Sequence, residues 1–128
     1  MKLEGIDHVA LTVSDVDRSV AWYREVLGLE RRFDEAWGNH PAFIGIGTTA
    51  LALFPATAAQ SKQTRGRDRI SMRHLAFRAD RTNFEQAQAE LNRHGVSFTF
   101  QDHEISHSIY FLDPDGHEIE ITTYEIRG

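Results

Sequence analysis

The fold is decided by a stretch that occurs twice in this chain. Near the N-terminus it reads Ile6-Asp7-His8-Val9-Ala10-Leu11-Thr12-Val13, and a helix-like run follows it and ends at Gly28. In the second half it reads Met72-Arg73-His74-Leu75-Ala76-Phe77-Arg78, and a second helix-like run ends at Gly95. The two histidines are 66 residues apart and the two glycines 67. A repeat of about half the chain length predicts two similar modules that bury their faces against each other.

The order of predicted elements is the same in both halves. Alternating and helical spacing of apolar residues predicts, in the first half, a strand over 6–13, a helix over 16–27, a strand over 29–33, a loop over 34–41, and a hairpin of 42–46 with 49–54. The second half gives a strand over 72–78, a helix over 82–94, a strand over 96–100, and a hairpin of 108–112 with 118–123. We therefore predict an α+β fold of two tandem βαβββ modules.

Length and composition restrict the organisation of the chain. Its 128 residues predict one domain, with module one at about 4–56, a linker at about 57–69 and module two at about 70–125. The net charge of −5 argues against a nucleic-acid partner, and no apolar run reaches the roughly 20 residues that span a bilayer. The N-terminus has no signal-peptide core, so we expect a cytoplasmic protein.

Strand alternation predicts one polar face that the two modules share. His8, Ala10 and Thr12 lie on one face of the first strand, and His74, Ala76 and Arg78 lie on the matching face of the second. Glu118 and Glu120 alternate with apolar neighbours in the last strand, and Tyr110 is expected on the same side. These faces predict a cupped sheet around a metal-binding cavity.

The candidate ligands are nitrogen and oxygen donors only. The chain has no cysteine, so a metal must be held by imidazole and carboxylate groups. Two imidazoles and one carboxylate leave coordination positions open, which suits Fe(II), Mn, Zn or a similar divalent ion and a chelating substrate. At this point, alternation allows either Glu118 or Glu120 as the acid.

Nearly the whole chain resembles the vicinal oxygen chelate superfamily, which includes glyoxalase I, fosfomycin-resistance thiol transferases, bleomycin-resistance proteins and extradiol dioxygenases. The most specific of the similar segments is Tyr110-Phe111-Leu112-Asp113-Pro114-Asp115-Gly116-His117-Glu118-Ile119-Glu120. The resemblance implies that His8, His74 and Glu120 are the metal ligands. A glyoxalase I would need a fourth ligand near Leu53, where the chain carries Ala52, Leu53 and Phe54. This absence argues against glyoxalase I.

Within this superfamily, the segment from His103 to Glu120 most resembles extradiol, ring-cleaving dioxygenases. That resemblance implies His103 as an acid–base group and Tyr110 as a hydrogen-bond donor to the substrate. It favours Fe(II), with Mn, Zn or Ni as alternatives. His107 is an alternative to His103.

Other members of the superfamily remain open as functions. A fosfomycin-resistance-like thiol transferase shares the three ligands and the tyrosine, although residues 96–107 contain no lysine or arginine to hold a phosphonate. A glyoxalase-like lyase or isomerase and a non-enzymatic, drug-sequestering protein are further alternatives. The resemblance also implies a small-molecule substrate, no nucleic-acid or membrane partner, and a homodimer in which His8 of one subunit joins the ligands of another.

Overall fold

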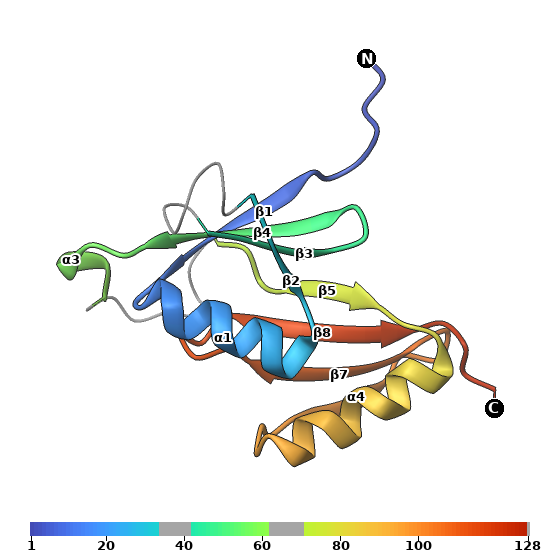
Figure 1. The fold of residues 1–128 in the computed structure, drawn as a ribbon. Coiled ribbons are helices and arrows are strands. Elements are labelled where there is room, and N and C mark those ends of the chain that lie inside the picture. Colours follow the sequence, from blue (N-terminus) through green and yellow to red (C-terminus); the bar gives the residue numbers. More distant parts are fainter. Residues whose placement is uncertain (34–41, 62–70, 128) are drawn as a thin grey trace. The chain divides into compact units, whose positions relative to one another are not determined.

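Two units, Met1–Thr64 and Arg65–Gly128, make up the chain in the computed structural model, which describes residues 1–33, 42–61 and 71–127 (Figure 1). Each unit contains one four-stranded mixed sheet and one long helix. The predicted order of elements, βαβββ twice, is therefore confirmed. The cupping of the two sheets around one cavity stays a prediction, as does the single-domain organisation.

The first unit contains β1 (His8–Val13), α1 (Val16–Leu27), β2 (Glu30–Arg32), β3 (Ala42–Ile46) and β4 (Thr49–Pro55). Its strand order is β1-β4-β3-β2, with β1 parallel to β4 and the other pairs antiparallel. Helix α1 packs against β3 and β4. The buried side chains Leu11 and Val13 alternate with exposed residues along β1, as predicted.

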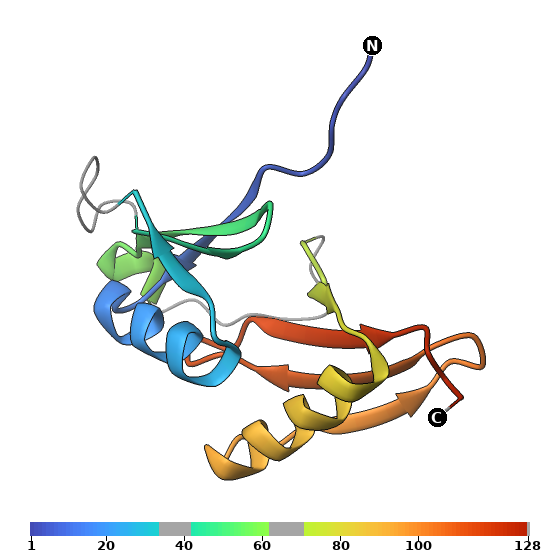
Figure 2. The same ribbon diagram turned by 45° about the vertical axis from the view of Figure 1, so that its right-hand side comes forward.

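The second unit repeats this topology. It contains β5 (Leu75–Arg78), α4 (Arg81–Arg93), β6 (Thr99–Asp102), β7 (His107–Leu112) and β8 (Glu118–Thr123), in the order β5-β8-β7-β6. Helix α4 runs along the sheet and contacts β8 (Figure 2). Phe84 and Leu91 of this helix and Ile109 and Ile119 of the sheet are buried. The opposite face of the sheet is thereby left for polar groups.

Local hydrogen bonds explain where the helices begin and end. Asp15 caps α1 by accepting from the backbone N–H of Arg18, and Gly28 ends the helix at a φ of 70°. Asp80 caps α4 through the N–H of Asn83, and Gly95 has the same left-handed φ of 70° just after His94, the C-cap. Gly28 and Gly95 therefore both adopt the left-handed conformation that follows the end of a helix.

Several predicted boundaries were wrong. His74 was expected inside a strand, but β5 begins one residue later at Leu75. The expected strand over 96–100 is shifted, since β6 covers Thr99–Asp102. The first part of the expected linker forms the short helix α3 (Ala58–Ser61), where Thr57 and Gln60 exchange hydrogen bonds. The loop expected over 34–41 lies outside the described residues. No helix in the described ranges is long and apolar enough to cross a membrane.

Candidate metal centre

Two of the three predicted metal ligands meet in the second unit. The Nε2 atom of His74 lies 2.9 Å from Oε1 of Glu120, with their side chains 28% and 11% exposed. The register explains the contact, because Glu120 pairs with Ala76 of β5, two residues after His74. His74 lies just before β5, and Ala76, the residue that pairs with Glu120, has only a methyl side chain. The β5–β8 register therefore brings His74 close to Glu120.

The turn between β7 and β8 places Glu120 in register. Asp113 accepts hydrogen bonds from the backbone N–H groups of Asp115 and His117, both at 2.9 Å. Gly116 supports this tight turn with a φ of 85°. The hairpin that follows sets Tyr110 directly opposite Glu120.

Tyr110 and His103 form a second contact beside the first. The Tyr110 hydroxyl lies 2.9 Å from His103 Nε2, and the Tyr110 ring meets the His74 ring edge-on at 5.6 Å. His103 lies in the turn from β6 to β7, where its backbone N–H donates to the carbonyl of Ser106. Glu104 in the same turn has a φ of 71°. Burial, and after it the charge of Glu120, raises the pKa of the Tyr110 phenol. The Tyr110 phenol therefore stays protonated at physiological pH.

One residue of the site was missed by the sequence reasoning. Ser108, fully buried in β7, donates a hydrogen bond of 2.6 Å to Oε2 of Glu120. Strand alternation along β7 places Ser108 on the same face as Tyr110. Only the β7–β8 register, in which Ser108 pairs with Thr122, indicates that it reaches the acid.

His8, the third predicted ligand, belongs to the first unit. Its Nδ1 atom lies 2.8 Å from Oδ2 of Asp7, and its ring lies 5.2 Å from that of Phe43. Its side chain is 42% exposed. Its convergence with His74 and Glu120 stays a prediction.

The register of the first unit corrects the predicted place of a fourth ligand. In β1–β4, Ala10 pairs with Ala52, as Ala76 pairs with Glu120 in β5–β8. Ala52 therefore corresponds to Glu120, whereas the sequence offset had selected Leu53. Phe43 pairs with Ala52 and so corresponds to Tyr110. The first unit therefore carries apolar residues at the two positions that correspond to Glu120 and Tyr110.

The donor set of the second unit fits a divalent ion. An ion with bonds of about 2.1 Å to nitrogen and oxygen can bridge donors as close as the His74–Glu120 pair. Within the described residues, no cluster of three histidine or acidic side chains forms around this pair. A complete site thus needs a donor from elsewhere, and His8 is the candidate. His74 Nδ1 is buried and has no hydrogen-bond partner in the part of the chain that the structure describes.

The remaining candidate residues lie away from this pair. His107 contacts the guanidinium of Arg81 at 2.8 Å and the Phe100 ring at 5.2 Å, and its position in β7 faces opposite to Tyr110. It is therefore not placed to replace His103. The Arg78 guanidinium lies over the ring of Tyr124, 4.6 Å from its centre.

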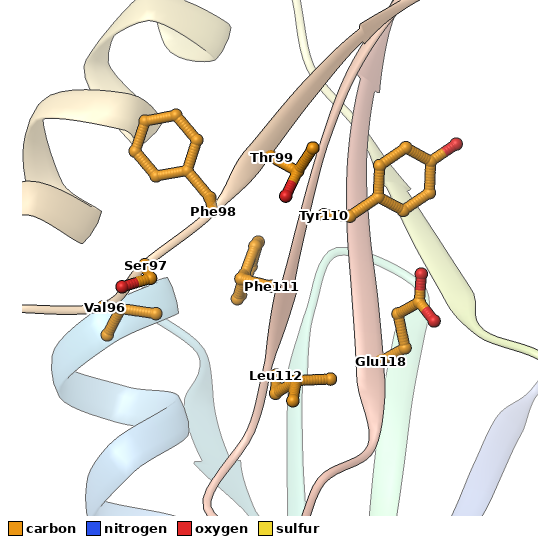
Figure 3. A pocket seen from close by; sticks show the side chains of 8 residues that line it. All are labelled: Val96, Ser97, Phe98, Thr99, Tyr110, Phe111, Leu112 and Glu118. Atoms are coloured by element: carbon orange, nitrogen blue, oxygen red, sulfur yellow. The ribbon is translucent and has the colours of Figure 1, made fainter. Parts of the chain in front are cut away.

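A pocket of about 430 Å³ adjoins Tyr110 within the second unit. Figure 3 shows Tyr110 and Glu118 projecting to the same side of the sheet. Glu118 is the one charged residue in a lining that comprises Val96, Ser97, Phe98, Thr99, Tyr110, Phe111, Leu112 and Glu118. The pocket therefore combines apolar side chains with the polar side chains of Ser97, Thr99 and Glu118.

Comparisons with known proteins agree with this architecture. The family model described as Glyoxalase/Bleomycin resistance protein/Dioxygenase superfamily matches residues 5–121. A glutathione transferase FosA of Serratia marcescens is 33% identical over 119 residues, which cover 93% of this chain and 80% of the relative. A metallothiol transferase FosB of Staphylococcus epidermidis is 30% identical over 130 residues, covering 99% and 87%. A solved glyoxylase/bleomycin resistance protein/dioxygenase domain from Frankia sp. EAN1pec is 25% identical, with a TM-score of 0.77, and covers 95% of this chain and 98% of that one.

Proposed function

The chain belongs to the glyoxalase/bleomycin resistance protein/dioxygenase superfamily, and from this premise we propose that it is a divalent-metal-dependent thiol transferase of the fosfomycin-resistance type. The observation that carries the proposal is the contact of His74 with Glu120 beside Tyr110. The curated relatives are named as thiol or glutathione transferases, which supports this function over the ring-cleaving dioxygenase that the sequence alone favoured.

In the proposed site, His8, His74 and Glu120 hold the metal. A divalent ion held by these residues would supply Lewis-acid chemistry to a substrate oxygen. Mn, Fe, Ni and Zn all accept such nitrogen and oxygen ligands. Because the proposed transfer involves no change of oxidation state, it gives no reason to prefer Fe(II) over the other divalent ions.

Tyr110 has the proposed role of proton donor. When a thiolate sulfur bonds to an epoxide carbon, the carbon–oxygen bond breaks and the freed oxygen takes up a proton. The Tyr110 hydroxyl stays protonated because burial raises the pKa of the phenol, and its contact with His103 provides a path to replace the proton. The thiol proton balances the one gained by the product, so no oxidant or reductant is needed.

The test is a conjugation assay with defined thiols and epoxides. Protein loaded with Mn(II), Ni(II) or Zn(II) is incubated with glutathione or cysteine and with charged and uncharged small epoxides. We expect a product whose mass is the sum of the two reactants, formed by the loaded wild type and not by His74→Ala. His94→Ala is the matched control, because His94 lies at the end of α4, near Glu90. If every thiol and epoxide pair is left unreacted by metal-loaded protein, the transferase proposal is wrong.

One observation keeps a dioxygenase as the second candidate. His103 and Tyr110, the pair that the dioxygenase resemblance singled out, lie within hydrogen-bond distance. Anaerobic loading with Fe(II), followed by a panel of catechols under air, tests this function. Yellow ring-cleavage products without thiol conjugation would place the dioxygenase ahead.

A further inference from the structure

The carboxylate of Glu120 is engaged at both oxygens. Oε1 faces His74 Nε2 at 2.9 Å, while Oε2 accepts the Ser108 hydroxyl at 2.6 Å. Ser108 is fully buried and Glu120 is 8% exposed, so solvent does little to replace this hydrogen bond. A hydrogen bond from a hydroxyl to a carboxylate is short and about twice as strong as a neutral one. One oxygen is thus tied to the sheet and the other faces the histidine.

The backbone of β7 and β8 supports Ser108 in turn. Its Oγ lies 3.0 Å from Oγ1 of Thr122, and that atom lies 3.3 Å from the carbonyl oxygen of His107. A serine hydroxyl can donate one hydrogen bond, and Ser108 donates it to the carboxylate of Glu120. The Thr122 hydroxyl is then the donor to Ser108 or to the His107 carbonyl. The rotamer of Ser108 is therefore held by the strands that carry it.

From this network we propose that Ser108 is a positioning residue of the metal centre, which holds Glu120 so that Oε1 faces His74. The inference rests on the metal site of the proposed function. The hydrogen bond from Ser108 turns Oε2 toward the sheet, so Oε1 is the oxygen that would be offered to an ion. Glu120 is also the polar partner that orients His74, since His74 Nδ1 has none among the described residues. Ser108 therefore orients two donors through one hydrogen bond.

A role in stability alone predicts a different result. If Ser108 only satisfies a buried acid, its loss lowers the free energy of unfolding and leaves the metal affinity of the folded protein unchanged. Metal affinity measured without substrate separates these roles. It also keeps the inference independent of the transferase reaction, because a protein that binds metal and fails to conjugate thiols still reports on Ser108.

The experiment measures the Kd for Mn(II) in the metal-free 128-residue protein, by the electron paramagnetic resonance signal of the free ion. We expect Ser108→Ala to weaken binding by about tenfold or more, as is typical when a group behind a ligand is lost. Ser108→Thr retains the hydroxyl and should bind within about threefold of wild type. Ser106→Ala is the matched control, since Ser106 is also buried and contributes its backbone carbonyl to the turn.

A double-mutant cycle tests whether Ser108 acts through Glu120. In a Glu120→Gln background, Ser108→Ala should change the Kd by less than about twofold. The inference is overturned if folded Ser108→Ala binds Mn(II) as wild type does, or if its loss is equally large without the acid. If Ser108→Ala does not fold, Ser108→Cys, whose thiol is a weak donor of similar size, should still weaken binding several-fold, and unchanged affinity overturns the inference. A wild type that takes up no divalent ion overturns both this inference and the proposed metal centre.

Discussion

Three polar side chains lie together on one face of the β7–β8 hairpin in the second unit. Ser108, Tyr110 and Glu120 lie next to each other because a two-residue alternation and an antiparallel register coincide there. Each has a distinct partner: the acid faces His74, the phenol faces His103, and the serine holds the acid. Substitutions at these positions should therefore separate metal binding from proton transfer.

Replacing Tyr110 by Phe should separate the two functions most clearly. The ring and its contact with His74 are retained, while the hydroxyl is lost. We expect the Kd for metal to stay within about threefold and kcat for thiol transfer to fall by about 100-fold, the usual scale for a lost proton donor. Steady-state kinetics at saturating metal measure the second effect. An equal loss of metal and activity would mean that Tyr110 acts by holding the site together.

The Tyr110 phenol should also lose its proton at a higher pH than an ordinary tyrosine. Burial and the nearby Glu120 charge raise its pKa above the ordinary 10.0. The resulting contribution to stability is present below that pH and is lost as the pH rises through the higher folded-state value. Ultraviolet absorption of tyrosinate in metal-free protein, compared with Tyr110→Phe, should show the missing phenol ionising above pH 10. Ionisation at or below the ordinary value would contradict the direction of this shift.

At the scale of elements, the turn between β7 and β8 decides where Glu120 lies. Asp113 closes this turn with two hydrogen bonds from backbone N–H groups. Asp and Gly satisfy specific turn conformations, so Asp113-Pro114-Asp115-Gly116 is also a turn signal at the level of the sequence. A substitution that disrupts this turn should change the position of β8 and thereby displace Glu120.

Asp113→Ala should lower the free energy of unfolding by about 1–3 kcal/mol, since the buried N–H of His117 and the part-buried N–H of Asp115 lose their acceptor. Asp113→Asn retains a side-chain oxygen and should lose much less. Urea unfolding followed by circular dichroism measures both. Equal stabilities of the Ala and Asn variants would show that the hydrogen bonds contribute little to the turn.

At the scale of the whole molecule, the question is whether His8 binds the same ion as His74 and Glu120. His8 lies in a different unit from these two residues. If all three hold one ion, wild-type protein should bind about one divalent ion per chain. His8→Ala and His74→Ala should both lose it, and His94→Ala should keep it. Metal analysis after gel filtration measures this. Retention of the ion by His8→Ala would remove His8 from the site.

The number of chains in the assembled protein is also a property of the whole molecule. The family resemblance led us to expect a homodimer in which His8 of one subunit joins His74 and Glu120 of another. Light scattering should then give about twice the mass of the chain, 14.6 kDa, and mixing His8→Ala with His74→Ala protein should restore metal binding at about one of the two sites of each mixed dimer. A monomer that holds metal would show that one chain completes the site.

The sequence alone determined the element order, the buried faces and the residues offered to the metal. These properties depend on neighbours a few positions apart: the spacing of apolar residues, helix caps at Asp15 and Asp80, and the turn at Asp113. Strand alternation correctly placed Tyr110 on the same face as Glu120. It failed where boundaries matter, as at Leu75, because strand ends depend on pairing partners far along the chain.

Only the tertiary structure decided which of these residues touch. The repeat offset of 67 selected Leu53 as the counterpart of Glu120, whereas the β1–β4 and β5–β8 registers select Ala52. The contact of Ser108 with Glu120 likewise needs the β7–β8 register in addition to the shared face. Alternation assigns a side chain to a face, but backbone pairing between strands fixes which side chains on that face are neighbours.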